Sequence, residues 1–210
     1  NRPLTTMHFA CTKHPTPLSV NRLLLLKKFL NEFPTSPYAE KVSNYLVEVY
    51  MNTRSYEAAL KSIERIAKPS AQIMEAKQKI LFQLGTQSFA NANFEQALQY
   101  LNQSIAIGQY NRQTKADAYY WCGESYYRLN RMMEAARDFN AYLQLTTQPN
   151  NEMYALANYN LGYIAFHRKD YTQASNYFQK YIQLGKRRKQ NSACRCLQPY
   201  RRLSSECAQL

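Results

Sequence analysis

Residues 156–182 read LANYNLGYIAFHRKDYTQASNYFQKYI, two helical patterns separated by a short polar turn. In the first pattern, Leu161, Ile164 and Ala165 recur at the three- and four-residue spacing of one helix face. The polar turn, residues 168–170, follows. The second pattern carries Tyr171, Ala174, Phe178, Tyr181 and Ile182. This stretch therefore predicts a pair of antiparallel helices.

The same pattern occurs four times in the chain. Its anchor position is occupied by Val47, Gly85, Gly123 and Gly162, in steps of 38, 38 and 39 residues. A glycine inside a helix costs about 1 kcal/mol relative to alanine, so we interpret these glycines as close-approach points between helices. The matching small residues of the second helix are Ala59, Ala97, Ala136 and Ala174. The repeat predicts an all-α fold, an α-solenoid of stacked antiparallel helical hairpins.

These residues resemble the tetratricopeptide repeat family. In the fourth unit, Asn160-Leu161-Gly162, Asp170-Tyr171, Ala174 and Tyr177-Phe178 fall on the signature positions of that family. The resemblance covers residues 29–185 and is weakest in the first unit, where Val47 replaces the small residue. It implies an array over residues 23–185, with a half-repeat at 23–34 and repeats at about 38–70, 76–108, 115–147 and 154–185.

A narrower resemblance concerns residues 33–39, Phe33-Pro34-Thr35-Ser36-Pro37-Tyr38-Ala39. This stretch is similar to the links between repeats in bacterial cell-envelope proteins, such as the lipoprotein subunit of the outer-membrane assembly machine. The similarity favours the bacterial cell envelope or periplasm over the cytoplasm. The apolar run Leu23–Leu26 is too short for a signal peptide, and the location stays undetermined.

Most of the net charge of +13 belongs to the two ends of the chain. Residues 1–28 carry five basic residues and no acid, and residues 186–210 carry seven basic residues and one acid. Neither the leader, residues 1–22, nor the tail, residues 186–210, follows the repeat pattern. Four interpretations of such ends remain open: a basic disordered tail, a nucleic-acid arm, an anionic-membrane patch, and residues that are not native.

A reading-frame hypothesis accounts for the tail. Codons can be chosen for residues 185–209 that encode, one base out of register, a peptide containing LADAYNRIGDC. This peptide parallels residues 115–123 at a plausible distance for the next repeat. We therefore interpret residues 186–210 as a frameshifted continuation of the array. The same origin is a candidate for the irregular leader, and the chain is then a fragment of a longer repeat protein.

The sequence contains no Gly-x-x-x-x-Gly-Lys phosphate loop, no Gly-x-Gly-x-x-Gly dinucleotide motif, no His-Glu-x-x-His zinc-protease motif and no Gly-x-Ser-x-Gly hydrolase motif. Cys194 and Cys196 lack the second ligand pair of a zinc site, and Cys122 is typical of a small buried apolar residue. His167, at the end of a helix beside two basic residues, is interpreted as a surface residue. The sequence predicts no enzyme activity, no metal and no cofactor.

In the tetratricopeptide repeat family the first helix of each unit lines a concave groove, which implies a groove rich in aromatic residues here. The residues at the matching positions are Lys79, Phe82, Thr86, Phe89, Asp117, Tyr120, Glu124, Tyr127, Arg128, Leu156, Tyr159, Tyr163, Phe166 and His167. The alternative interpretation is that half of these side chains pack against neighbouring helices. The Lys and Asn residues with which chaperone-binding members grip a carboxylate are replaced by tyrosines and Glu124, which argues against that mechanism.

Three functional hypotheses follow from this sequence. The leading one is a non-catalytic scaffold that binds a peptide or protein segment in the concave groove. The second is a structural spacer in a cell-envelope assembly, with open array ends that self-associate. The third is binding of RNA or an anionic surface through the basic tail, which includes Lys186-Arg187-Arg188-Lys189.

Overall fold

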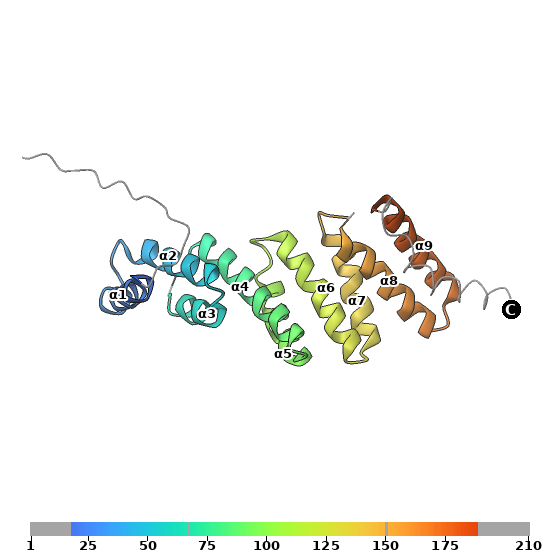
Figure 1. The fold of residues 1–210 in the computed structure, drawn as a ribbon, viewed down its shortest axis with the longest axis horizontal. Helices are drawn as coiled ribbons and strands as arrows, with labels where there is room; N and C mark the ends of the chain where they lie inside the picture. Colours follow the sequence, from blue (N-terminus) through green and yellow to red (C-terminus); the bar gives the residue numbers. More distant parts are fainter. Residues whose placement is uncertain (1–17, 67, 150, 189–210) are drawn as a thin grey trace, which may run out of the picture.

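The computed structural model describes residues 18–66, 68–149 and 151–188. Regular structure within these ranges is entirely helical, and the helices form one elongated row from α1 to α9 (Figure 1). The helices are α1 (Leu18–Glu32), α2 (Ala39–Asn52), α3 (Tyr56–Glu64), α4 (Ala71–Ala90), α5 (Phe94–Ala106), α6 (Arg112–Arg128), α7 (Met132–Leu145), α8 (Glu152–His167) and α9 (Tyr171–Arg188). The prediction of an all-α helical solenoid is confirmed.

The helices pair into four hairpins, α2/α3, α4/α5, α6/α7 and α8/α9, with α1 preceding them. We call α2, α4, α6 and α8 the first helices and their partners the second helices. Helix α1 begins at Leu18, before the predicted start at residue 23, and α9 continues to Arg188, beyond residue 185. The predicted array limits were set by the repeating pattern of small residues. A helix can continue beyond that pattern, because its backbone hydrogen bonds do not depend on it. Residues 1–17 and 189–210 of the predicted leader and tail lie outside the described residues.

Each hairpin turn contains one residue in the left-handed backbone conformation. These residues are Arg54, Ala92, Asn130 and Lys169, with φ between 55° and 62°, and they follow the same steps of 38, 38 and 39 residues. The backbone N–H of the residue that follows bonds back to the end of the first helix. In the third hairpin, for example, the N–H of Arg131 donates to the carbonyl of Tyr126 over 2.9 Å. This pattern is a Schellman motif, which satisfies carbonyls left free at a helix end.

Side chains also fix the links between hairpins. Asn111 and Asn151 cap α6 and α8 by accepting from the backbone N–H of the third helical residue, over 2.9 and 2.7 Å. The buried amide of Gln78 donates to the backbone carbonyl of Asn111 over 2.8 Å and accepts from its N–H over 2.9 Å. One hairpin later, the side-chain oxygen Oε1 of Gln113 accepts from the backbone N–H of Thr147 over 3.0 Å. The long links are therefore tied to the first helices.

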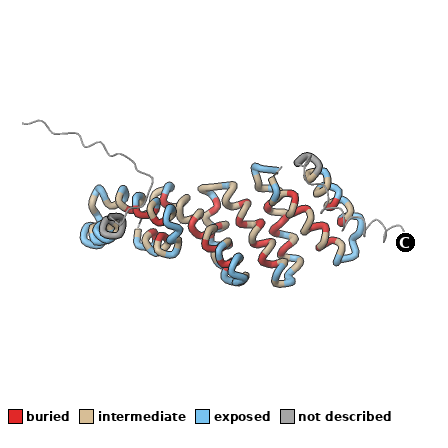
Figure 2. Tube along the Cα trace, viewed as in Figure 1, coloured by how far each residue is buried: buried red, intermediate tan, exposed pale blue. Residues whose placement is uncertain are grey.

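The core lies between the two helices of each hairpin and between neighbouring hairpins, as the buried segments of Figure 2 show. Ala59, Ala97 and Ala174 are fully buried on the second helices, as expected. The prediction for the third unit is wrong by one residue, because Ala135 is fully buried and Ala136 is only partly buried. Ala135 is the fourth residue of its helix, like Ala97 and Ala174.

Two further features concern the whole array. Cys122 is buried in the core with a free thiol, as predicted, and burial raises its pKa. Over the ranges that the structure describes, none of the helices combines the length and the apolar character that crossing a membrane requires.

Candidate functional site

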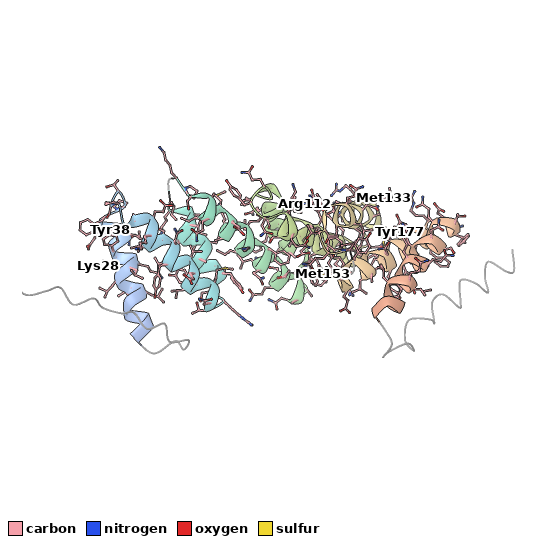
Figure 3. The ribbon with its side chains drawn as sticks, turned by 90° about the horizontal axis from the view of Figure 1, so that it is seen from above. Lys28, Tyr38, Arg112, Met133, Met153 and Tyr177 are labelled. Atoms are coloured by element: carbon pink, nitrogen blue, oxygen red, sulfur yellow. The ribbon has the colours of Figure 1, made fainter. Side chains whose placement is uncertain are left out.

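Consecutive first helices meet through partly exposed side chains, and we call the surface they form the first-helix face. Viewed from above in Figure 3, side chains extend along the whole row of helices, from Lys28 and Tyr38 at the α1 end to Tyr177 on α9. The first-helix face consists of Phe89 on α4, Trp121, Glu124 and Tyr127 on α6, and Tyr159, Asn160, Tyr163 and Phe166 on α8.

Two aromatic rings join α4 to α6 on this face. The ring centroids of Phe89 and Trp121 lie 5.0 Å apart with an interplanar angle of 61°. Such edge-to-face pairs contribute about 0.5–1.5 kcal/mol beyond the area that they bury. Trp121 also packs at 5.5 Å on Tyr120, which connects the face to the core. The α4 and α6 portions of the face are therefore held in one arrangement.

A hydrogen-bonded carboxylate joins α6 to α8. Glu124 Oε1 accepts from the hydroxyl of Tyr120 over 3.1 Å and from the side-chain amide of Asn160 over 2.5 Å. None of the ion pairs among the described residues involves Glu124. The carboxylate is thus oriented by two neutral donors from different hairpins.

The α8 portion of the face is a cluster of rings supported by α9. The Tyr159 ring lies 4.9 Å from Tyr163, 5.8 Å from Phe178 and 5.1 Å from Tyr181. Burial, and then the neighbouring hydroxyl of Tyr163, raise the pKa of Tyr159 above its ordinary value. The pKa of Tyr127 is raised by burial and then by Tyr163 and Glu124. These phenols therefore stay neutral at physiological pH and can donate hydrogen bonds.

Tyr120 requires a correction to the predicted groove. Its side chain is only 4% exposed, because it packs on Phe139 and Tyr142 of α7 at 5.8 and 5.4 Å. Burial, and then Glu124, raise the pKa of Tyr120. Tyr120 is therefore a positioning residue for Glu124 and lies in the core.

The other predicted groove residues are at least partly exposed. Lys79 forms an ion pair with Glu75 over 2.7 Å, and Asp117 accepts from Gln113 over 2.7 Å while burial raises its pKa. Arg128 and His167 lie exposed at the ends of α6 and α8. The structure brings together Glu124, Tyr127, Tyr159, Tyr163 and Phe166. Phe82 packs against the core, and Phe89 contacts Trp121.

Sequence reasoning missed Trp121 and Asn160. Each stands two residues before the glycine of its unit, at 123 and 162, and each contacts the preceding first helix. That shared offset was the signal available in the sequence. Tyr181, expected only as a core residue of the second helix, packs on Tyr159.

Comparisons with known proteins agree with this architecture. Residues 82–152 match the family model described as tetratricopeptide repeat. No curated protein matches the chain in sequence. A crystal structure of MamA is similar at a TM-score of 0.51 and 19% identity, covering 79% of this chain and 88% of that chain.

Two further crystal structures are similar in the same way. One, of MamA protein, has a TM-score of 0.50 and 20% identity over 81% of this chain and 85% of that chain. The other, of BtubC (BKLC) from P. vanneervenii, has a TM-score of 0.54 and 12% identity over 83% of this chain and 74% of that chain. At such identities the similarity shows the fold alone. Residues 82–152 thus belong to the tetratricopeptide repeat family, and the hairpins on either side of them continue the same helical solenoid.

Proposed function

We propose that this protein is a non-catalytic interaction scaffold that binds an extended or helical segment of another protein on the first-helix face. The observation that carries the proposal is the row of partly exposed rings along this face, Phe89, Trp121, Tyr127, Tyr159 and Tyr163. Aromatic side chains are enriched at the energetic centres of protein interfaces.

The support beneath these rings favours binding. Tyr163 lies 5.4 Å from the Phe178 ring at an interplanar angle of 89°, and Tyr159 packs on the same ring. Phe178 is itself buried against Ala174 and Ala165. Side chains held in one arrangement before binding lose little conformational entropy when a partner arrives. The tyrosines therefore offer contact area at low entropic cost.

The test is selection of a phage-displayed library of random dodecapeptides on the full chain. A variant combining Tyr127→Ala, Tyr159→Ala and Tyr163→Ala should bind the selected peptides at least about tenfold more weakly, equivalent to about 1.4 kcal/mol. The control is Tyr38→Ala with Tyr45→Ala, two exposed tyrosines outside the face. Circular dichroism checks that both variants remain folded. Unchanged binding by the triple variant would exclude the first-helix face.

One observation favours a second candidate, a structural spacer that associates through its end. The α1 and α2 region exposes large apolar side chains, namely Leu24, Leu25, Phe33, Tyr38 and Tyr45. Leu24 and Leu25 are 68% and 65% exposed, and contiguous exposed apolar side chains often mark interaction surfaces. Sedimentation of the wild type and of a variant combining Leu24→Lys and Leu25→Lys tests this candidate. Dimers that dissociate only in the variant would support it.

Binding of RNA or an anionic surface through the basic tail stays a prediction, since residues 189–210 lie outside the described residues. A steep salt dependence of RNA binding that disappears on deleting residues 186–210 would support it.

A further inference from the structure

We infer that the segment bound by the first-helix face carries a lysine or arginine side chain, which docks on the carboxylate of Glu124. This inference rests on the proposed function and specifies the chemistry of the partner. It follows from the hydrogen bonding, the charge and the aromatic surroundings of this one side chain.

The hydrogen bonds of Glu124 leave one oxygen available. Both donors, the Tyr120 hydroxyl and the Asn160 amide, bind Oε1. In the described part of the chain no hydrogen bond reaches Oε2. The two donors come from α6 and α8, so they fix the plane of the carboxylate without neutralising it. Glu124 therefore presents an oriented acceptor before any partner binds.

Among the described residues, no basic side chain forms an ion pair with Glu124. Arg128 stands four residues further along α6, a spacing that permits an ion pair, but the structure shows none between them. By contrast, Glu75 pairs with Lys79 on its own helix, and Glu134 pairs with Arg131, the residue before α7. A cation from a partner would give this carboxylate the ion pair that it lacks among the described residues.

Tyrosines of α6 and α8 flank Glu124 on the first-helix face. Tyr127 stands three residues after Glu124 on α6, a spacing that places two side chains side by side on a helix, and Tyr163 stands three residues after Asn160 on α8. Tyrosine faces attract ammonium and guanidinium groups, by about 0.5–1 kcal/mol at exposed sites and more when the cation is desolvated. The rings can also cover the methylene stem of lysine or arginine. A carboxylate beside two tyrosines is therefore suited to a basic side chain and unsuited to an acidic one.

The test uses the dodecapeptide selection on the full chain and on two variants. Glu124→Gln keeps an oxygen that can accept from Tyr120 and Asn160, so we expect it to fold. Glu134→Gln is the matched control, since Glu134 pairs with Arg131 outside the face. Peptides selected on the wild type should share a Lys or Arg at a fixed distance from an apolar residue. Their affinity should fall at least about tenfold for Glu124→Gln and stay unchanged for Glu134→Gln.

A double-mutant cycle locates the contact. Replacing the shared lysine of a selected peptide by norleucine, or a shared arginine by citrulline, should weaken binding to the wild type but not weaken binding to Glu124→Gln further. Peptides that bind the face without a shared basic residue would overturn the inference and leave the proposed function standing. A library that yields no binder to the wild type would overturn both.

Discussion

A Cβ atom added to Gly123 would lie 2.8 Å from Cδ1 and Cε1 of Phe139, so the ring of α7 rests directly against the backbone of α6. The same relation joins Gly162 to Phe178 at 2.8 Å and Gly85 to a side-chain carbon of Leu101 at 2.6 Å. The regular glycines are therefore explained by the contact between the two helices of a hairpin.

This contact predicts that Gly123→Ala destabilises the protein. The extra methyl should force the Phe139 ring to move, at a cost of about 1–3 kcal/mol. The gain in helix propensity, about 1 kcal/mol, offsets only part of that cost. The measurement is the midpoint of urea unfolding. Gly185→Ala is the control, since nothing lies within 4 Å of its added Cβ, and it should be neutral or stabilising. Equal stability of the two variants would contradict the packing argument.

The hairpin turns predict a stabilising substitution. Ala92 has a φ of 60°, a conformation that costs a residue with a side chain about 1–2 kcal/mol relative to the ordinary helical region. Ala92→Gly should remove much of this strain and raise the unfolding midpoint. The same change at Ala141, inside α7, should instead cost about 1 kcal/mol. A loss of stability in Ala92→Gly would show that the turn is unstrained.

The two hydrogen bonds between Gln78 and Asn111, which we call the clamp, predict a local loss of stability when Gln78 is replaced. Gln78→Ala removes both hydrogen bonds and leaves the partly buried N–H and carbonyl of Asn111 without their partner, at a cost of about 1–3 kcal/mol. Hydrogen exchange should show faster exchange of the Asn111 amide. Gln87→Ala, exposed on the same helix, is the control. Unchanged exchange at Asn111 would contradict the role of the clamp.

Asp138 predicts a pH dependence of stability. Its side chain is buried, and burial raises its pKa above the ordinary value of 3.8, although Arg137 opposes the shift from 2.8 Å. At pH values between 3.8 and the raised pKa of folded Asp138, the native protein binds more protons than the unfolded chain. In this range the free energy of unfolding therefore falls as the pH rises.

Asp138→Asn should therefore flatten this dependence and be at least as stable as the wild type at pH 7. Unfolding midpoints at pH 4 and pH 7 check the prediction. If the variant is less stable than the wild type at pH 7 but not at pH 4, the ionised carboxylate stabilises the fold, contrary to this interpretation.

The sequence was sufficient for the fold because the steps of 38 and 39 residues mark a contact that every hairpin must make. It was insufficient for the register of α7, since Ala135 and Ala136 are adjacent small residues and the repeat pattern fits either. The helical backbone of α1 and α9 extends beyond the predicted array limits at residues 23 and 185, because the repeat pattern stops before the helices do.

The candidate site was predictable in part. Family positions identify the side of each first helix, and Tyr127, Tyr159 and Tyr163 indeed lie there partly exposed. Family positions do not show how deeply a side chain is buried, so Tyr120 was predicted on the surface although it lies in the core. The bond between Glu124 and Asn160 depends on the rotation of one hairpin relative to the next, which no single repeat encodes.

That bond also has a mechanical consequence. Glu124 and Asn160 belong to different hairpins, so bending or untwisting the rod at this joint would stretch the bond between them. A bound segment that favours the intact hydrogen bond must make the solenoid stiffer between these two hairpins. By thermodynamic reciprocity, a tension that breaks the bond must lower the affinity for that segment.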